Sequence, residues 1–124
     1  MTLAVLFLSG CADKTNIPNT DMEVARAFIK NSNENKFDEA EKLVLDDKTN
    51  KESFTLFKKY FQSRSKDELE KYKNSDIIIN EIIPESDSVT IINYSNSNKK
   101  ENKTKIKAVK SNGRWLIDLK YTLF

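Results

Sequence analysis

Residues 107–118 read Lys-Ala-Val-Lys-Ser-Asn-Gly-Arg-Trp-Leu-Ile-Asp, and this stretch decides the fold. Asn112-Gly113 is the strongest short signal for a β-hairpin, because both turn residues tolerate a positive φ. Before the turn, residues 104–110 alternate between apolar and charged side chains. After it, residues 114–121 predict a final strand. Alternation places one set of this strand's side chains on one face (Trp115, Ile117, Leu119 and Tyr121) and the other set on the opposite face (Arg114, Asp118 and Lys120).

Two further strands are predicted upstream of the hairpin. Residues 77–83 are too rich in isoleucine to form a surface helix, and β-branched residues favour strands. A turn over residues 84–88 leads to a strand over 89–94, and a polar connection over 95–98 leads to the hairpin. The sequence therefore predicts a four-stranded antiparallel meander.

The first half of the chain has helical periodicity. Thr20 and Glu23 form a capping-box pattern and open a first helix that ends over residues 31–35. A second helix is predicted over 37–45, and a third follows a break at 46–50. Ser65 and Glu68 form a second capping box before a short helix. Helices followed by strands predict an α+β fold, with the N-terminal helices packed on a curved four-stranded antiparallel sheet.

Composition excludes several kinds of chemistry. The chain has no histidine and one cysteine, which removes an internal disulfide, most nucleophilic triads and most zinc sites. Lysines outnumber arginines 18 to 3, which we interpret as codon bias rather than nucleic-acid binding. Charge is uneven, with a net −4 over residues 21–47 and a net +5 over residues 99–110. We expect no cofactor, no metal and no nucleic-acid partner.

Leu8-Ser9-Gly10-Cys11 follows a six-residue apolar run and resembles a bacterial lipobox, the signal for lipidation of cysteine. The resemblance implies a lipoprotein signal peptide at 1–10, a tether at 11–20 lipidated on Cys11, and a single α+β domain at 21–124. It also implies a cell-envelope protein held on a membrane by its lipid, since the run is too short to span a bilayer. The run is short and lacks a preceding basic residue, and an upstream natural start is one explanation. The alternative is a chance cysteine after a short apolar N-terminus.

Residues 24–29, 36–43 and 107–118 together resemble the nuclear-transport-factor-2-like superfamily, whose members form a cystatin-like α+β cone. The likeness covers about residues 21–121 and is greatest to small secreted lipoproteins of unassigned function. It implies the cone fold and a cavity between sheet and helices. It does not imply an activity.

Two groups of side chains are candidate binding sites. Six aromatic residues either line an apolar ligand cavity or simply fill the core, and three lysines either form a surface for a partner or lipid or keep a sheet edge solvated. A Ca²⁺ site at Asp46 and Asp47 lacks the rest of a ligand loop, so these carboxylates are expected in a solvated turn. The aromatic set is Phe28, Phe54, Phe57, Tyr60, Phe61 and Trp115, and the lysine set is Lys103, Lys105 and Lys107.

No catalytic constellation stands out. A ketosteroid-isomerase-like site, as in some enzymes of the superfamily, would pair Glu81 or Asp118 with Tyr60, Tyr72 or Tyr94, but none matches a family motif. We expect Asp118 to be a solvated partner of Lys120 or Arg114. The predicted function is a non-catalytic, lipid-anchored binding or scaffolding domain with an envelope protein or glycan as partner. A carrier or sensor of a small apolar ligand is the alternative, and an enzyme comes third.

Overall fold

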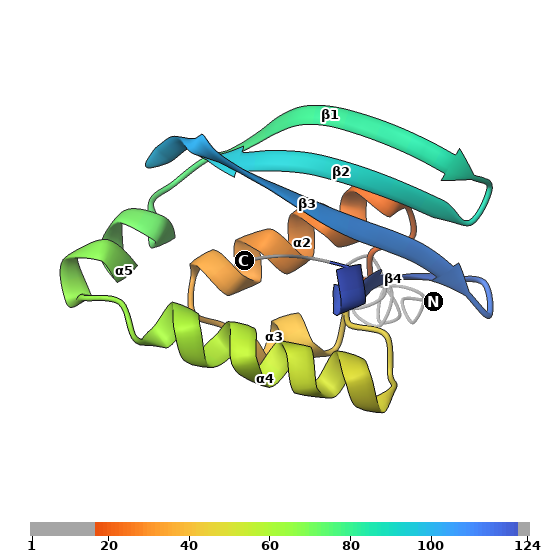
Figure 1. Cartoon of the computed structure of the whole chain (residues 1–124), viewed down its shortest axis with the longest axis horizontal. Helices are drawn as coiled ribbons and strands as arrows, with labels where there is room; N and C mark the ends of the chain where they lie inside the picture. Colours follow the sequence, from red (N-terminus) through yellow and green to blue (C-terminus); the bar gives the residue numbers. More distant parts are fainter. Residues whose placement is uncertain (1–16, 122–124) are drawn as a thin grey trace, which may run out of the picture.

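The computed structural model describes residues 17–121, which form helices packed with a four-stranded antiparallel sheet (Figure 1). The predicted α+β class is confirmed. The signal peptide, the lipobox with Cys11 and most of the tether lie outside the described residues. The elements are α2 (Asp21–Asn33), α3 (Phe37–Glu41), α4 (Lys48–Gln62), α5 (Lys66–Lys73), β1 (Ile77–Ser86), β2 (Val89–Asn96), β3 (Lys99–Ser111), β4 (Arg114–Asp118) and the 3-10 helix η1 (Leu119–Tyr121).

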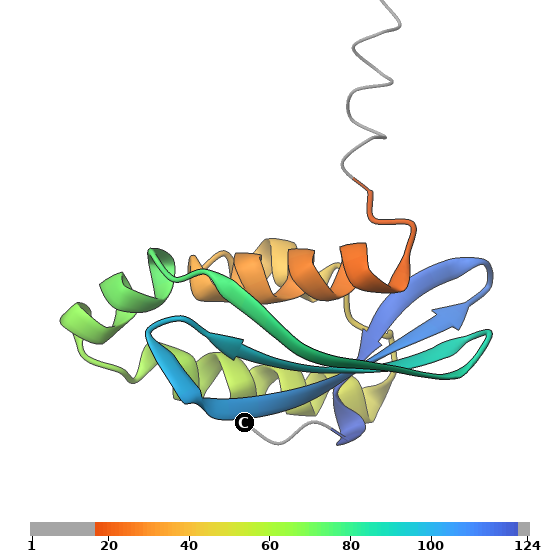
Figure 2. The same ribbon diagram turned by 90° about the horizontal axis from the view of Figure 1, so that it is seen from above.

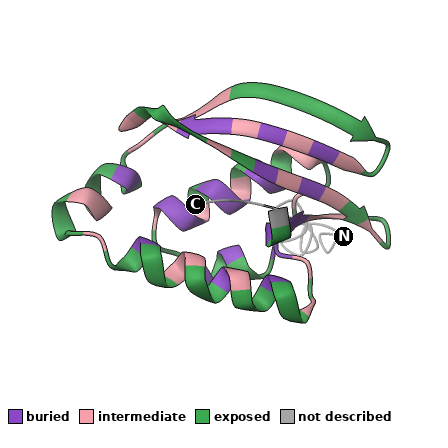
Figure 3. Cartoon of the chain, viewed as in Figure 1, coloured by how far each residue is buried: buried purple, intermediate pink, exposed green. Residues whose placement is uncertain are grey.

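The sheet is the predicted meander, with strand order β1-β2-β3-β4. Viewed from above, the strands form one strongly twisted sheet and α2 runs along it (Figure 2). Along β2, buried residues alternate with less buried ones, whereas β1 is mostly exposed (Figure 3). Thr90 and Ile92 of β2 pair with Ala108 and Ile106 of β3, and all four are buried. This row forms the face of the sheet that packs on the helices.

The hairpin at residues 112–113 is confirmed. Asn112 has a φ of 53° and Gly113 a φ of 77°, as a two-residue turn with both central residues left-handed requires. β3 and β4 pair from Ser111 with Arg114 to Lys107 with Asp118. This register brings Ile117 opposite Ala108 in the core.

Two strands, β1 and β3, are longer than predicted. β1 continues through Pro84 to Ser86, so the predicted turn at 84–88 narrows to residues 87–88. Pro84 is tolerated because β1 is an edge strand, where a missing N–H breaks no ladder hydrogen bond on the open side. β3 starts at Lys99, five residues before the predicted alternation.

Both predicted helix caps are present. The Thr20 hydroxyl accepts a hydrogen bond from the Glu23 N–H at 3.1 Å, and the Ser65 hydroxyl accepts one from the Glu68 N–H at 3.2 Å. Glu23 completes its capping box one residue early, because its carboxylate accepts from the Asn19 N–H at 2.9 Å. Each cap satisfies helix N–H groups that have no partner within the helix.

The predicted helix over 37–45 is too long, since α3 ends at Glu41. The chain then forms a parallel bridge between Val44 and Ile117 of β4. The Ile117 N–H donates to the Leu43 carbonyl at 2.8 Å, and the Leu45 N–H donates to the Ile117 carbonyl at 2.8 Å. Pairing with the open edge of β4 replaces the helical hydrogen bonds of this segment, which periodicity alone cannot reveal.

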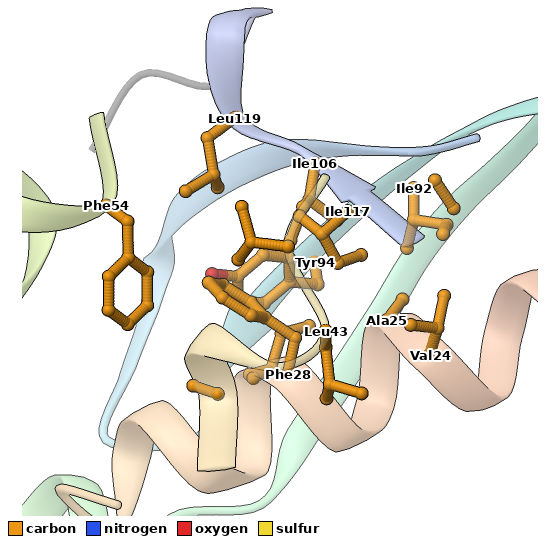
Figure 4. Close-up of a cluster of buried hydrophobic side chains, with 14 of the residues drawn as sticks. Val24, Ala25, Phe28, Leu43, Phe54, Ile92, Tyr94, Ile106, Ile117 and Leu119 are labelled. Atoms are coloured by element: carbon orange, nitrogen blue, oxygen red, sulfur yellow. The ribbon is translucent and has the colours of Figure 1, made fainter. Parts of the chain in front are cut away.

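The core lies between α2 and the sheet. Side chains of α2, the 43–45 segment, α4 and the strands point toward one another in Figure 4. Val24 and Phe28 of α2 are at most 1% exposed, as are Ile92, Ile106 and Ile117 of the sheet. Burying each such side chain stabilises the fold by roughly 1.5–3 kcal/mol. Over the part of the chain that the structure describes, no helix is long and apolar enough to cross a membrane.

Candidate ligand-binding cleft

A cleft of about 690 Å³ opens at the end of the molecule where α5 lies. It is bounded by the C-terminal halves of α2 and α4, by α5, and by the adjoining ends of β2 and β3. Its volume lies within the roughly 300–1,000 Å³ of small-molecule sites. The lining residues are Phe28, Ile29, Ser32 and Asn33 of α2, Phe57, Tyr60 and Phe61 of α4, Ser63, Arg64, Tyr72 of α5, Tyr94 and Asn96 of β2, and Lys99, Glu101, Asn102, Lys103 and Thr104 of β3.

One wall of the cleft is aromatic. The Phe28 and Phe57 rings stack with centroids 5.8 Å apart, and Phe61 meets Tyr72 edge to face at 5.3 Å. Phe37, behind this wall, contacts Phe61 at 5.4 Å and fixes it against the core. Such pairs hold one another in place, so the wall is preformed rather than assembled on binding.

Several polar groups of the cleft are already paired. Asn33 donates its side-chain amide to the Asn96 oxygen at 2.7 Å, which joins α2 to β2. The Ser32 hydroxyl donates to the Phe28 carbonyl at 2.8 Å. Lys99 forms an ion pair with Glu68 at 3.2 Å, which ties β3 to α5. These pairs fix the shape of the cleft by joining α2 to β2 and β3 to α5.

Tyr94, which belongs to the core cluster of Figure 4, is one of the buried residues that line the cleft. Burial raises the pKa of the Tyr94 hydroxyl above its ordinary value, the nearby Tyr72 adds to the rise, and a hydrogen bond with Thr104 opposes it. Tyr94 therefore stays neutral at physiological pH. Its neutral hydroxyl can form hydrogen bonds but cannot act as a base toward a ligand.

The rim of the cleft is cationic. Arg64, Lys99 and Lys103 line it against one carboxylate, Glu101. The Arg64 guanidinium carbon lies 4.7 Å from the centre of the Tyr72 ring and 5.1 Å from that of Phe61. Cation–π attraction to two rings holds this side chain over the aromatic wall.

The structure separates the six predicted aromatic residues. Phe28, Phe57, Tyr60 and Phe61 line the cleft, although Tyr60 is 69% exposed and lies at its mouth. Phe54 is buried in the core against Phe37, with ring centroids 5.9 Å apart. Trp115 packs on the core from β4. Neither Phe54 nor Trp115 lines the cleft.

The three predicted lysines share the outer side of β3 by alternation, with different surroundings. Lys103 reaches the rim of the cleft. Lys105 is exposed and pairs in register with Asn93. Lys107 is half-buried and lies opposite both Ile91 and Asp118.

Asp118 is a partner of Lys120, as expected, but it is buried rather than solvated, which corrects that prediction. It is 6% exposed, and its carboxylate lies 3.5 Å from the Lys120 ammonium. Asn50, which is fully buried, donates its amide to Asp118 at 3.2 Å and accepts from the Leu119 N–H at 2.6 Å. A buried asparagine inside α4 secures the turn from β4 into η1, and alternation cannot reveal such a partner.

The remaining candidate carboxylates lie elsewhere. Asp47 caps α4 by accepting from the Asn50 N–H at 2.8 Å, a bond that lowers its pKa together with the Lys120 contact. Asp46 pairs with Lys51 at 3.1 Å. Glu81 is exposed on β1, and neither Glu81 nor Asp118 lines the cleft beside a tyrosine. Among residues 17–121 there is no group of three or more potential metal ligands.

Sequence reasoning missed Arg64 and the Asn33–Asn96 pair as lining residues, and it named Tyr94 only as a candidate of a ketosteroid-isomerase-like site. Tyr94 lies on the same face of β2 as the buried Thr90 and Ile92. Alternation along the strand therefore predicts that the Tyr94 side chain faces the interior. Arg64 stands between two helices, after the α4 C-cap and before the Ser65 N-cap, and no pattern indicates its direction.

Fold and cleft together define an α+β protein with a preformed, ligand-sized cleft between its helices and one end of its sheet. Comparisons with known proteins return no match for the chain, whether with family models, with curated protein sequences or with solved structures.

Proposed function

We propose that this chain is a lipid-anchored, non-catalytic binding protein of the bacterial cell envelope, and that its cleft takes a small ligand with an apolar part. The cleft of about 690 Å³ with its stacked aromatic wall is the observation that carries this proposal. Its size suits a small molecule, and apolar and aromatic lining is usual for such sites.

The absence of a suitable acid–tyrosine pair supports a binding role over a catalytic one. A ketosteroid-isomerase-like mechanism needs a carboxylate that faces the bound substrate beside a proton donor. Tyr72 and Tyr94 line the cleft, whereas the one carboxylate in the lining, that of Glu101, belongs to an exposed residue. The expected acids, Glu81 and Asp118, lie outside the lining.

The anchor and the family are part of the same proposal. The lipobox-like Leu8-Ser9-Gly10-Cys11 supports attachment through a lipid on Cys11, and two acyl chains suffice for stable membrane binding. Helices followed by an antiparallel meander support membership of the nuclear-transport-factor-2-like superfamily. Fractionation of cells that express Cys11→Ala tests the anchor, and unchanged membrane association would refute it.

Two exposed side chains on α4 give a matched test of the cleft. Tyr60 is 69% exposed and lines the mouth, whereas Leu56, one turn earlier, is 56% exposed and does not line it. Decanol, a neutral apolar probe, is titrated into the full chain and followed by ¹H–¹⁵N NMR. We expect Tyr60→Ala to weaken decanol binding about five-fold, as for a contact worth about 1 kcal/mol, while Leu56→Ala leaves it unchanged. Equal affinities for the two variants would contradict the proposal.

A further inference from the structure

The ligand's chemistry can be narrowed from the charges on the cleft rim. We propose that the cleft binds an amphipathic anion, with its acidic group on the Arg64 guanidinium and its apolar part against Phe57 and Tyr60, the less buried aromatic side chains of the wall. This inference rests on the proposed function of the cleft and adds the class of ligand.

Several polar side chains of the cleft are paired within the protein, whereas the Arg64 guanidinium is not. Asn33, Ser32 and Lys99 are each engaged within the protein, at 2.7 Å, 2.8 Å and 3.2 Å respectively. The Arg64 guanidinium makes no hydrogen bond or ion pair with any residue in the described range, although it lies near two rings. Its N–H donors are therefore free to meet an acceptor on a ligand.

The position of Arg64 suits it to an anion. The Tyr72 and Phe61 rings, at 4.7 Å and 5.1 Å, restrain the guanidinium plane before any ligand arrives. A restrained guanidinium loses less freedom for each hydrogen bond that it forms, and its donors match a carboxylate or phosphate in pairs. The two rings hold the guanidinium beside the aromatic wall, and its N–H groups remain for the ligand.

The charge balance of the rim points the same way. Three cations, Arg64, Lys99 and Lys103, line the cleft against Glu101. Lys99 is compensated by Glu68, so Arg64 and Lys103 against Glu101 leave the net positive charge that a ligand meets. A cation would be repelled there, and a neutral molecule would leave the donors of Arg64 to water. An anion with an apolar body contacts the cations of the rim with its charged group and the aromatic wall with its apolar part.

The test compares four ten-carbon probes that share an apolar tail: decanoate, decyl phosphate, decanol and decyltrimethylammonium, each below its micelle concentration. We expect the full chain to bind the two anions about 10- to 100-fold more tightly than decanol, the range for hydrogen bonds to charged groups. Decyltrimethylammonium should bind more weakly than decanol. The ratio of decyl phosphate to decanoate distinguishes a phosphate-bearing ligand from a carboxylate.

Variants assign the effect to Arg64. Arg64→Gln should reduce the preference for the anions over decanol by about ten-fold or more, since it removes a charged donor. Arg64→Lys keeps the positive charge but loses the paired N–H donors of the guanidinium, so it should retain part of the preference for anions. Arg26→Gln is the matched control, because Arg26 is exposed on α2 and does not line the cleft.

The outcomes separate this inference from the function on which it rests. Equal affinity of the unaltered chain for decanoate and decanol, or an anion preference that survives Arg64→Gln, would overturn the assignment of an anionic ligand while the cleft remains a binding site. Failure of all four probes to bind would overturn the proposed function itself. The comparison of probes on the unaltered chain does not depend on any variant's stability.

Discussion

Replacement of Asn50 by alanine should destabilise the protein out of proportion to the size of the change. Asn50 is fully buried in α4, donates its amide to the Asp118 carboxylate at 3.2 Å, and accepts from the Leu119 N–H at 2.6 Å. Its amide also lies 3.2 Å from Asp47 at the start of the helix. One side chain thus joins α4 to the turn between β4 and η1.

The magnitude follows from the groups left behind. Loss of a hydrogen bond to a charged group costs about 1.5–3 kcal/mol, and an orphaned buried N–H at Leu119 costs about 1–3 kcal/mol. Alanine regains about 0.7 kcal/mol through its higher helix propensity. We therefore expect Asn50→Ala to lower the free energy of unfolding by about 2–5 kcal/mol.

Urea denaturation followed by circular dichroism measures the effect, with Thr49→Ala as the control. Thr49 is the exposed neighbour in the same helix turn, and its loss should change the free energy of unfolding by less than about 0.5 kcal/mol. Asn50→Asp should destabilise more at pH 7 than at pH 4, because a third carboxylate then faces Asp47 and Asp118. A loss below about 1 kcal/mol for Asn50→Ala would refute the reasoning.

Three further predictions test other elements. Gly113→Ala should cost about 1–2 kcal/mol through backbone strain alone, because Gly113 has a φ of +77° and no heavy atom lies within 4 Å of an added Cβ; an unchanged urea midpoint would contradict this. Ser65→Ala should lower stability by about 1 kcal/mol through loss of the α5 N-cap, whereas Lys66→Ala beside it should not. Burial raises the folded-state pKa of Tyr94 above the ordinary value of 10.0, so stability is retained below pH 10 and falls as pH rises above it. Tyr94→Phe should lessen that alkaline loss in urea titrations from pH 8 to 11, and an identical slope for both proteins would exclude this cause.

Local signals predicted most of the fold. Thr20 and Ser65 mark helix starts through short-range hydrogen bonds, and Asn112-Gly113 marks a turn through its own backbone preference. Such features depend on residues a few positions apart, so they can be recognised without the tertiary structure. The order of helices and strands then leads to the α+β class.

What the sequence did not reveal depends on contacts between distant segments. α3 ends early because residues 43–45 pair with Ile117 of β4, which is distant in the sequence. Asp118 is buried because Asn50, from another element, satisfies its carboxylate. The six candidate aromatic residues could be named from the sequence, but only packing decides that Phe54 joins the core while Phe57 also borders the cleft. Arg64 is recognised as a candidate ligand-binding residue only from its position near the Phe61 and Tyr72 rings in the structure.

The most direct test of the central claim is a ¹H–¹⁵N NMR titration of the full chain with decanoate. Binding in the cleft should concentrate the shift changes at the amides of Ser32, Arg64, Tyr94 and Thr104 and leave the region around Asn50 unaffected. Changes spread evenly over the surface, or confined to residues outside the cleft, would contradict it.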